Sequence, residues 1–348
     1  MRVGFMTNFN KPTKLAKITS LISKAYGIEM IYLRPKDIIM EENKVKGKVY
    51  INNSWEERIV DIPSFIDVVP YCFKKENREI MNYLKDKTFL SDNRSNVISK
   101  IQLQDMLKDD QEFSHLIIPT HNVKTSKDII HYLNEYSSIV LKPLKGIRGR
   151  GVYILNKNSN HYTVGFKTNE REMNENQIAT FFEEEIEGKS YILQKYVQSR
   201  TLHGDPFDCR VHVEKGEDGK WHSARSYIRI GIGQKVISNV NQGGGISEPK
   251  PFLKTNFGEE KWTLINKKLK KIAVTLPYKV EELRGTHIMS LGMDIGIDKD
   301  GELYLFEVND GPATAALISE VAYLRSNYYN HILNELGKTS TKKELYDK

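Results

Sequence analysis

The stretch LFEVND, at residues 305–310, places two oxygen-bearing side chains one residue apart at the end of an apolar run. Alternate residues of a β-strand point to the same face, so Glu307 and Asn309 are expected to lie side by side. Glu307 interrupts the otherwise apolar run LYLFEV, and a carboxylate buried in such a run is unfavourable without a partner. We therefore expect this face either to be solvated or to meet a group that binds oxygen atoms.

A third oxygen-bearing residue, Asp294, lies on the strand expected just before this one. The sequence MDIGIDKDGELYLFEVND, at residues 293–310, predicts a hairpin that turns at residues 299–301. Asp294, Glu307 and Asn309 offer oxygen ligands without sulfur or imidazole, which suits Mg²⁺ bound together with substrate phosphates. A solvated hairpin face is the common alternative, but the apolar run around Glu307 favours the metal.

A second segment has features of a phosphate site. The sequence LKPLKGIRGRGVYIL, at residues 141–155, predicts a strand, a basic glycine-rich loop and another strand. Lys142 ends the first strand, and Gly146, Gly149 and Gly151 would let backbone amides approach an anion closely. Because a strand follows instead of a helix, the loop is not the dinucleotide fingerprint. On this segment alone, a phosphate-covering flap and a plain basic hairpin are equally good interpretations.

Composition limits the class of protein. The 348 residues predict two or three structural units, and 39% apolar with 28% charged residues is typical of a globular protein. Two cysteines, Cys72 and Cys209, are too few for a disulfide framework, and neither a signal peptide nor a run of ~20 apolar residues is visible. We expect a cytoplasmic protein without a membrane partner, and the sequence leaves its oligomeric state open.

The net charge of +7 raises the question of nucleic acid. The sequence shows no zinc-finger spacing, no RNP-like aromatic motif and no uninterrupted basic run, so nucleic acid is disfavoured as a partner. A lysine-rich surface explains most of the charge, and a pocket for a polyanionic small molecule would collect Lys and Arg as well.

Several short motifs do not support other chemistries. GKS at 188–190 lacks the earlier glycine of a P-loop, since Glu184 holds that position. DKDG at 298–301 has its glycine too early for a calcium loop and fits a hairpin turn better. His212 and Glu214 lack the Cys-x-x-Cys partner of a zinc deaminase.

Periodicity and turn residues predict the remaining elements. Strands are expected at 2–7, 28–33, 65–73, 115–123, 191–197, 207–215, 221–232 and 235–240, with a further hairpin at 44–63. Helices are expected at 11–27, 77–86, 95–110, 127–136, 177–190 and 261–283, the last with a break at Pro277.

Together these segments resemble the ATP-grasp superfamily, and within it the spore-coat-associated branch found in spore-forming bacteria. The matching stretches occur in the family's order: IVLKPLKGIRGRGVYIL, YILQKYV, DPFDCRVHVEK, YIRIGIGQKVISNVNQGGG and LGMDIGIDKDGELYLFEVNDGPA. Glu307 lies 13 positions after Asp294, similar to the spacing in D-alanine–D-alanine ligases.

The resemblance implies a fold and a division into domains. The fold class is α/β, with α+β character in the central and C-terminal parts: an ATP-grasp fold with an N-terminal Rossmann-like pre-ATP-grasp domain. The implied parts are an N-terminal α/β domain, a central subdomain with the phosphate flap, a C-terminal subdomain with the metal site and a polar tail. Their expected ranges are 1–90, 91–190, 191–335 and 336–348.

The resemblance also implies roles for individual residues. Lys100, Lys142 and the flap residues Gly146, Arg148, Gly149 and Gly151 match the positions that hold the nucleotide phosphates. Gln194, Lys195, Tyr196 and Val197 match the linker strand along the adenine edge. Asp294, Glu307 and Asn309 match the magnesium ligands. Arg210 and Arg229 match basic positions facing the transferred phosphate or the acceptor carboxylate, and Asn239 with the glycines at 243–245 matches the segment near the substrate.

The implied activity is that of an ATP- and Mg²⁺-dependent carboxylate–amine ligase, which forms an amide through an acyl phosphate. Its substrates would be a small-molecule or peptide carboxylate and an amine. A kinase on the same fold and a non-catalytic spore-coat protein remain alternatives. Two departures from the family pattern fall on the acceptor side: FIDVVPYC, at residues 65–72, lacks an arginine, and Gly292 stands where D-alanine–D-alanine ligases carry one.

Overall fold

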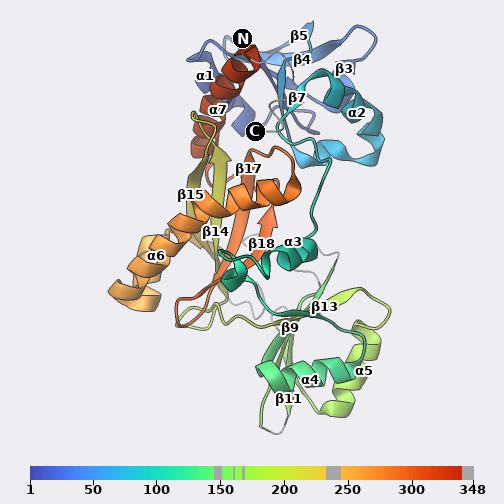
Figure 1. Cartoon of the computed structure of the whole chain (residues 1–348), viewed down its shortest axis with the longest axis vertical. Coiled ribbons are helices and arrows are strands. Elements are labelled where there is room, and N and C mark those ends of the chain that lie inside the picture. Colours follow the sequence, from blue (N-terminus) through green and yellow to red (C-terminus); the bar gives the residue numbers. More distant parts are fainter. Residues whose placement is uncertain (145–150, 160, 167–168, 233–243, 339–348) are drawn as a thin grey trace.

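Three sheets are stacked along the long axis of the molecule (Figure 1). The computed structural model describes residues 1–144, 151–159, 161–166, 169–232 and 244–338. Within these residues, a seven-stranded N-terminal sheet lies at one end, a five-stranded C-terminal sheet in the middle and a six-stranded central sheet at the other end. The C-terminal sheet therefore lies between the N-terminal sheet and the central sheet.

The N-terminal sheet has the order β3-β4-β2-β1-β6-β7, with β5 paired to β4. Its parallel pairs are β1 with β2, β1 with β6 and β6 with β7, as expected for an α/β unit. The elements, in chain order, are β1 Arg2–Met6, α1 Lys14–Lys24, β2 Glu29–Leu33, β3 Ile38–Ile39, β4 Lys44–Ile51, β5 Ser54–Asp61, β6 Phe65–Val68, α2 Arg78–Lys87 and β7 Phe89–Leu90.

Local sequence explains where several of these elements begin and end. The predicted hairpin at 44–63 is confirmed, and its turn places Asn52 and Asn53 at positive φ, a conformation that asparagine tolerates. The strand predicted at 65–73 ends at Val68 instead, because Pro70 starts a short 3₁₀ turn.

The central sheet is antiparallel and has the order β12-β11-β10-β9-β13-β8. Helices α4 and α5 contribute side chains to its apolar core, together with β9, β10, β11 and β13. The elements are β8 Thr120–Asn122, α4 Ser126–Tyr136, β9 Ser138–Pro143, β10 Tyr153–Lys157, β11 Tyr162–Phe166, β12 Asn169–Met173, α5 Glu175–Glu185 and β13 Tyr191–Lys195. The predicted strands on either side of the glycine loop are confirmed, whereas β11 and β12 were not predicted.

The C-terminal sheet has the order β16-β15-β14-β17-β18 and carries helices on both faces. On one face α6 shares an apolar core with the sheet, and α3 adds Leu103 and Leu107 to it. The elements are α3 Lys100–Leu107, β14 Phe207–Lys215, β15 Trp221–Ile230, β16 Gly245–Ser247, α6 Pro249–Arg284, β17 Ser290–Ile297, β18 Leu303–Asn309 and α7 Ile318–Lys338. The strand predicted at 235–240 lies outside the described residues.

Two helix predictions need correction. The break expected at Pro277 is wrong: α6 runs through this buried proline, and the non-helical residue inside it is Gly258, with φ of 79°. Only glycine adopts that conformation without strain. The helix expected at 95–110 begins at Lys100, because the Ser99 hydroxyl accepts from the Gln102 N–H in a capping box.

Helix α7 joins the C-terminal part of the chain to the N-terminal unit (Figure 1). Its apolar residues Val321, Tyr328 and Tyr329 share one core with Val3 and Phe5 of β1. The two ends of the described chain are therefore packed together, an arrangement that the sequence analysis did not predict.

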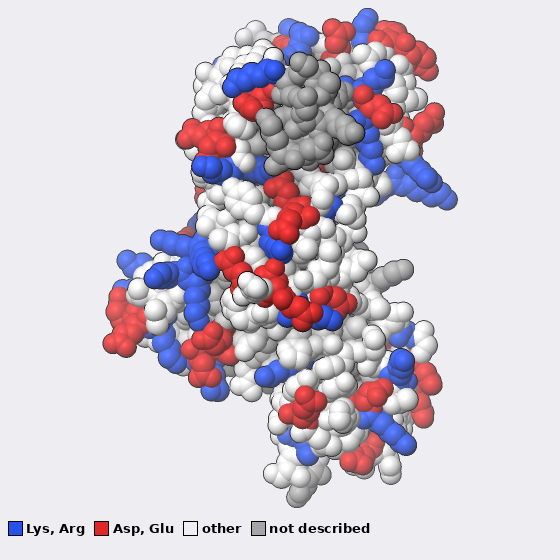
Figure 2. Space-filling view, in the orientation of Figure 1, with Lys and Arg blue, Asp and Glu red and all other residues white. Residues whose placement is uncertain are grey.

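The charged surface and the hydropathy of the helices agree with a globular protein. Figure 2 shows acidic and basic side chains intermixed on the face drawn there, so the excess positive charge does not form one continuous basic surface on it. No helix in the described part of the chain is long and apolar enough to cross a membrane.

Candidate active site

The hairpin of β17 and β18 gathers the three predicted oxygen ligands. Its register places Asp294 opposite Glu307 and Gly292 opposite Asn309. Side chains of directly opposed residues lie on the same face, and the Asn309 Nδ2 donates to the Asp294 Oδ2 at 3.4 Å. The predicted hairpin is confirmed, and the shared oxygen face that it implied is present.

A β-bulge in this hairpin sets the position of an aromatic side chain. The register shifts between Asp294 and Ile295, which pairs with Leu305, so Phe306 is left without a direct partner. Its ring fills the space above Gly296, where an added Cβ would come within 2.2 Å of the Phe306 Cζ. The sequence analysis missed this residue, because a bulge cannot be read from strand alternation alone.

Two lysines from separate elements approach the Glu307 end of the site. Lys100, the first residue of α3, places its Nζ 2.6 Å from the Glu307 Oε1. On β9, the Lys142 Nζ donates to the Gln194 Oε1 at 2.8 Å. Burial and the nearby positive charge of Lys100 together lower the pKa of Lys142 to about 8, although the Glu307 carboxylate opposes them. Charged residues of the central sheet and of the C-terminal hairpin, Lys142 and Glu307, therefore lie close together with Lys100.

The Gln194 side chain positions Lys142 from within the central sheet. Gln194 is buried, and its Nε2 donates to the Thr120 Oγ1 at 2.7 Å. The Thr120 hydroxyl in turn donates to the Gln104 Oε1 at 3.0 Å. Because the amide nitrogen is held by Thr120, the amide oxygen is oriented towards the lysine. Sequence reasoning placed Gln194 in the linker strand and missed both this use of its side chain and the roles of Thr120 and Gln104.

The other linker residues follow directly along the chain. Lys195 is exposed, and its backbone N–H donates to the Pro119 carbonyl at 3.0 Å. The Tyr196 N–H donates to the Ser138 carbonyl at 3.0 Å, and Val197 is buried. The linker is thus fixed to the end of the central sheet before the chain enters the C-terminal sheet.

Two arginines surround Asp294 at the other end of the site. Arg210, on β14 directly opposite Asp294, pairs through its Nε with the Oδ1 and through its Nη2 with the Oδ2 at 3.0 Å. Arg229, on β15, places its Nη2 2.9 Å from the Asp294 Oδ2 and is itself held by both oxygens of Asp208, at 2.7 and 2.8 Å. Although burial lowers the pKa of Arg229, the two carboxylates raise it above its ordinary value.

Gly292 shows how the missing arginine is accommodated. A Cβ at this position would lie 2.7 Å from the Pro312 Cβ and 3.2 Å from the Arg210 Nη1. An arginine at position 292 would therefore collide with the loop that follows β18 and with the guanidinium of Arg210. The guanidinium of Arg210, on the neighbouring strand β14, lies over Gly292 instead.

Part of the predicted phosphate flap falls outside the described residues. Gly146, Arg148 and Gly149 lie there, as does Asn239 near the predicted substrate segment. Gly151 is described, with φ of 73° and no room for a side chain, since a Cβ would lie 2.7 Å from the Tyr191 Oη. The end of the flap thus has a structural requirement for glycine.

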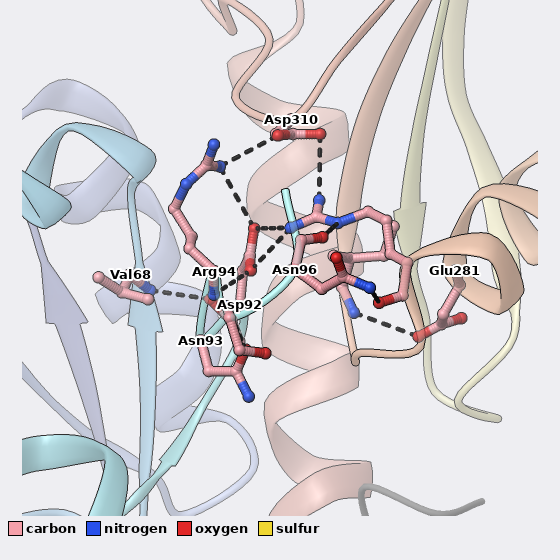
Figure 3. A network of polar contacts seen from close by, with 11 residues as sticks. Val68, Asp92, Asn93, Arg94, Asn96, Glu281 and Asp310 are labelled. Atoms are coloured by element: carbon pink, nitrogen blue, oxygen red, sulfur yellow. Dashed lines mark hydrogen bonds and ion pairs between the residues drawn. The ribbon is translucent and has the colours of Figure 1, made fainter. Parts of the chain in front are cut away.

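A charge network fixes the far end of β18 (Figure 3). Asp310, directly after Asn309, pairs with the Arg94 Nη1 at 3.0 Å and the Arg284 Nη1 at 3.1 Å. Arg284 is 2% exposed, and its Nη2 donates to both oxygens of Asp92 at 3.1 Å. The network ties the segment that precedes α3 to the end of the β17–β18 hairpin, and the sequence analysis did not predict it.

Asp294, Glu307 and Asn309 form a set of oxygen donors at one end of the hairpin. Within the described residues, no group of three or more His, Cys, Asp or Glu side chains is placed to hold a metal ion. Asp294, Glu307 and Asn309 supply two carboxylates and one amide oxygen, all of them hard ligands. Mg²⁺ is commonly held by one or two carboxylates together with substrate phosphates and water. The residues present therefore fit a magnesium ion that arrives with a nucleotide.

Comparison with known proteins bears on the same part of the chain. Residues 90–334 match the family described as YheC/D like ATP-grasp. The endospore coat-associated protein YheD of Bacillus subtilis (strain 168) is 23% identical over 97% of this chain and 78% of its own length. YheC of the same organism, also named as endospore coat-associated, is 23% identical over 84% of this chain and 83% of its own length.

Solved structures agree in fold. A complex of the ATP-grasp ligase PsnB with minimal precursor, Mg and ADP has a TM-score of 0.54, with 11% identity over 97% of this chain and 98% of that one. D-cycloserine synthetase DcsG has a TM-score of 0.50, with 12% identity over 95% and 100%. The ATP-grasp fold predicted from the sequence is confirmed, and at this identity the likeness shows the fold alone.

Proposed function

Because the chain belongs to the YheC/D-like ATP-grasp family, we propose that it is an ATP- and Mg²⁺-dependent ligase that joins a carboxylate to an amine. One observation carries the proposal: Lys100 of α3 pairs with Glu307, the charges of both act on Lys142 of the central sheet, and Asp294 lies opposite Glu307 in the hairpin. Two cationic side chains beside two carboxylates and an amide are the groups that a metal-bound triphosphate requires.

ATP would lie between the central and C-terminal sheets. Lys100 and Lys142 would contact its phosphates, and Gly151 would anchor a flap that carries Gly146, Arg148 and Gly149 over them. Gln194, Lys195, Tyr196 and Val197 would border the adenine, with the Phe306 ring nearby, and Asn239 would approach the substrate. Asp294, Glu307 and Asn309 would hold the Mg²⁺, which supplies charge neutralisation of the β- and γ-phosphates.

The proposed reaction has two steps. A substrate carboxylate attacks the γ-phosphorus, which releases ADP and leaves an acyl phosphate. An amine then attacks the acyl carbon, which releases phosphate and leaves an amide. The protein would contribute positioning and preorganised positive charge, with Arg210 and Arg229 placed to stabilise the negative charge that develops.

A peptide or small-molecule carboxylate is the proposed acceptor. PsnB, which shares the fold, is described in complex with a precursor peptide and AMPPNP. The loop after β18 lies against the N-terminal unit, since a Cβ on Gly311 would come within 3.0 Å of Pro70. We propose that the acceptor binds next to this contact, beside Arg210 and Arg229.

The domain division is proposed as 1–90, 91–190, 191–335 and the tail 336–348. We propose that the ligase acts in the cytoplasm, where Mg²⁺ and ATP are abundant and where the two buried cysteines, Cys72 and Cys209, would remain free thiols. The names of the curated relatives add the spore coat as a second location to test.

Calorimetry with AMP-PNP, with and without Mg²⁺, tests the nucleotide site. We expect Mg²⁺-dependent binding by the full chain and its loss in Lys142→Met. Incubation with ATP, candidate carboxylates and amines, followed by mass analysis, then separates the alternatives. A ligase gives an amide, ADP and phosphate, whereas a kinase leaves a stable phosphorylated product. Absence of any nucleotide binding would favour a non-catalytic coat protein.

A further inference from the structure

Both carboxylates of the proposed metal site are already paired with cations of the same chain. Glu307 is paired with Lys100, and Asp294 is paired with Arg210 and Arg229. The Asp294 carboxylate also accepts from the Asn309 amide. A metal ion that binds Asp294 therefore competes with two guanidinium groups for this carboxylate, and Arg210 engages both of its oxygens.

The two arginines differ in what else holds them. Arg229 has a second carboxylate partner, Asp208, which engages it through two hydrogen bonds. Within the described residues, Asp294 is the sole carboxylate that Arg210 contacts. If Asp294 changes partner, Arg229 keeps a bidentate pair with Asp208, whereas Arg210 becomes an uncompensated buried cation.

An uncompensated buried guanidinium is strongly unfavourable, so Arg210 needs a new anion as soon as Asp294 is taken. Its Nη1 already lies over Gly292, a position without a side chain, beside the loop that follows the β17–β18 hairpin. A planar guanidinium is well suited to bind a phosphate or carboxylate through two parallel hydrogen bonds. The anion that replaces Asp294 can therefore be a phosphate of the nucleotide or the carboxylate of the acceptor.

We propose that Arg210 and Asp294 form an exchange switch, in which metal binding to Asp294 releases Arg210 to bind the reacting anion. This inference rests on the proposed function and extends it. The metal alone binds poorly, because Arg210 competes for Asp294. The metal binds well together with a nucleotide, because the displaced arginine then gains a phosphate. Metal and anion are thus coupled through one side chain.

Binding of Mn²⁺ to the full chain, followed by electron paramagnetic resonance, tests the exchange without any turnover. In the absence of nucleotide, Arg210→Gln should bind Mn²⁺ about tenfold more tightly than the unmodified protein, since one charge-assisted competitor is removed. The matched control is Arg225→Gln, an arginine on β15 that pairs with Glu248 and Glu320 and should not change the affinity. Adding Asp294→Asn to Arg210→Gln should abolish the gain.

The same titration with AMP-PNP present gives the opposite sign. Arg210→Gln should then bind the metal–nucleotide pair more weakly than the unmodified protein, because the released arginine is missing. A purely structural role of Arg210 would not reverse the effect in this way. If Arg210→Gln raises the affinity for Mn²⁺ by less than about twofold in the absence of nucleotide, the exchange is wrong.

The outcomes also separate this inference from the proposed function. If the unmodified protein shows Asp294-dependent Mn²⁺ binding with AMP-PNP but Arg210→Gln shows no gain without it, the exchange alone is wrong. If no Asp294-dependent binding occurs under either condition, the metal site is wrong and the exchange falls with it.

A measurement on the unmodified chain covers the case in which Arg210→Gln does not fold. The Arg210 Nε–H resonance, assigned by its loss in Arg210→Lys, should shift when Mg²⁺ and AMP-PNP are added together. The Arg225 resonance should stay in place. An unchanged Arg210 resonance in the saturated complex would overturn the exchange.

Discussion

The two ends of the candidate site use ion pairs of different kinds. At the Glu307 end, the Lys100 side chain is 55% exposed and that of Glu307 29%. At the Asp294 end, the side chains of Arg210 and Asp294 are 9% and 8% exposed. Exposed pairs contribute little to stability, whereas breaking a buried pair leaves an uncompensated charge. The comparison predicts that the Glu307 end is dedicated to function, while the Asp294 end serves function and folding together.

The largest expected effect is on turnover, at the Glu307 end of the site. Lys142→Met should reduce the rate of ADP release by about 10²–10³-fold, because the substitution removes a charge that stabilises the transferred phosphoryl group. The matched control is Lys157→Met on β10. Among the described residues its Nζ donates only to the Asn134 side chain, and the variant should retain activity. Retention of full activity by a folded Lys142→Met would remove the lysine from the mechanism.

The next effect is on stability at the buried end. Asp294→Ala leaves Arg210 without its carboxylate and Arg229 with one of two, and it should lower the free energy of unfolding by about 3 kcal/mol. Urea denaturation measures the change. If Glu307→Ala lowers the free energy of unfolding by as much as Asp294→Ala, the two ends of the site do not differ in their contribution to stability.

A pH dependence sharpens the comparison further. Burial lowers the pKa of Lys142 to about 8, so the ammonium form dominates below that pH and is lost above it. Affinity for AMP-PNP should therefore fall as the pH rises through 8, by up to about tenfold per unit. Because phosphate favours the charged form, binding at pH 9 should be accompanied by proton uptake. Calorimetry in buffers of different ionisation enthalpy measures this uptake, which should vanish in Lys142→Met.

The smallest effect is expected from the exposed pair itself. Glu307→Gln should change the free energy of unfolding by less than about 1 kcal/mol, since the Lys100 partner is largely solvated. The same variant should fail to turn over ATP, because a metal ligand is lost. Thermal denaturation and an ADP-release assay on one preparation measure the two effects, and a large loss of stability would show that this end also supports the fold.

Local patterns were sufficient for the parts of the site that lie on a single hairpin or a single strand. Strand alternation placed Asp294, Glu307 and Asn309 on one face, and the glycine-rich loop pointed to Lys142. Both features depend on neighbours in sequence or on a short turn, where periodicity is informative. The predicted hairpins and the α/β start follow from the same signals.

Features that depend on distant pairs could not be predicted in this way. Arg284, at the end of α6, pairs with Asp92 and Asp310, which are distant in sequence. Gln194 on β13 contacts Thr120 on β8 and Lys142 on β9. The bulge that places Phe306 and the passage of α6 through Pro277 reflect tertiary packing that overrides local preference. The competition of two arginines for one carboxylate is likewise visible only in three dimensions.

The packing of α7 against the first strands has a consequence for synthesis of the chain. The N-terminal sheet leaves the ribosome before α7 can cover Val3 and Phe5, since Tyr328 and Tyr329 are translated more than 300 residues later. At ~5–20 residues per second, the delay between the two is on the order of ten seconds to one minute. During that interval this apolar surface is open to chaperones, and the emergence of α7 from the ribosome is the event that covers it.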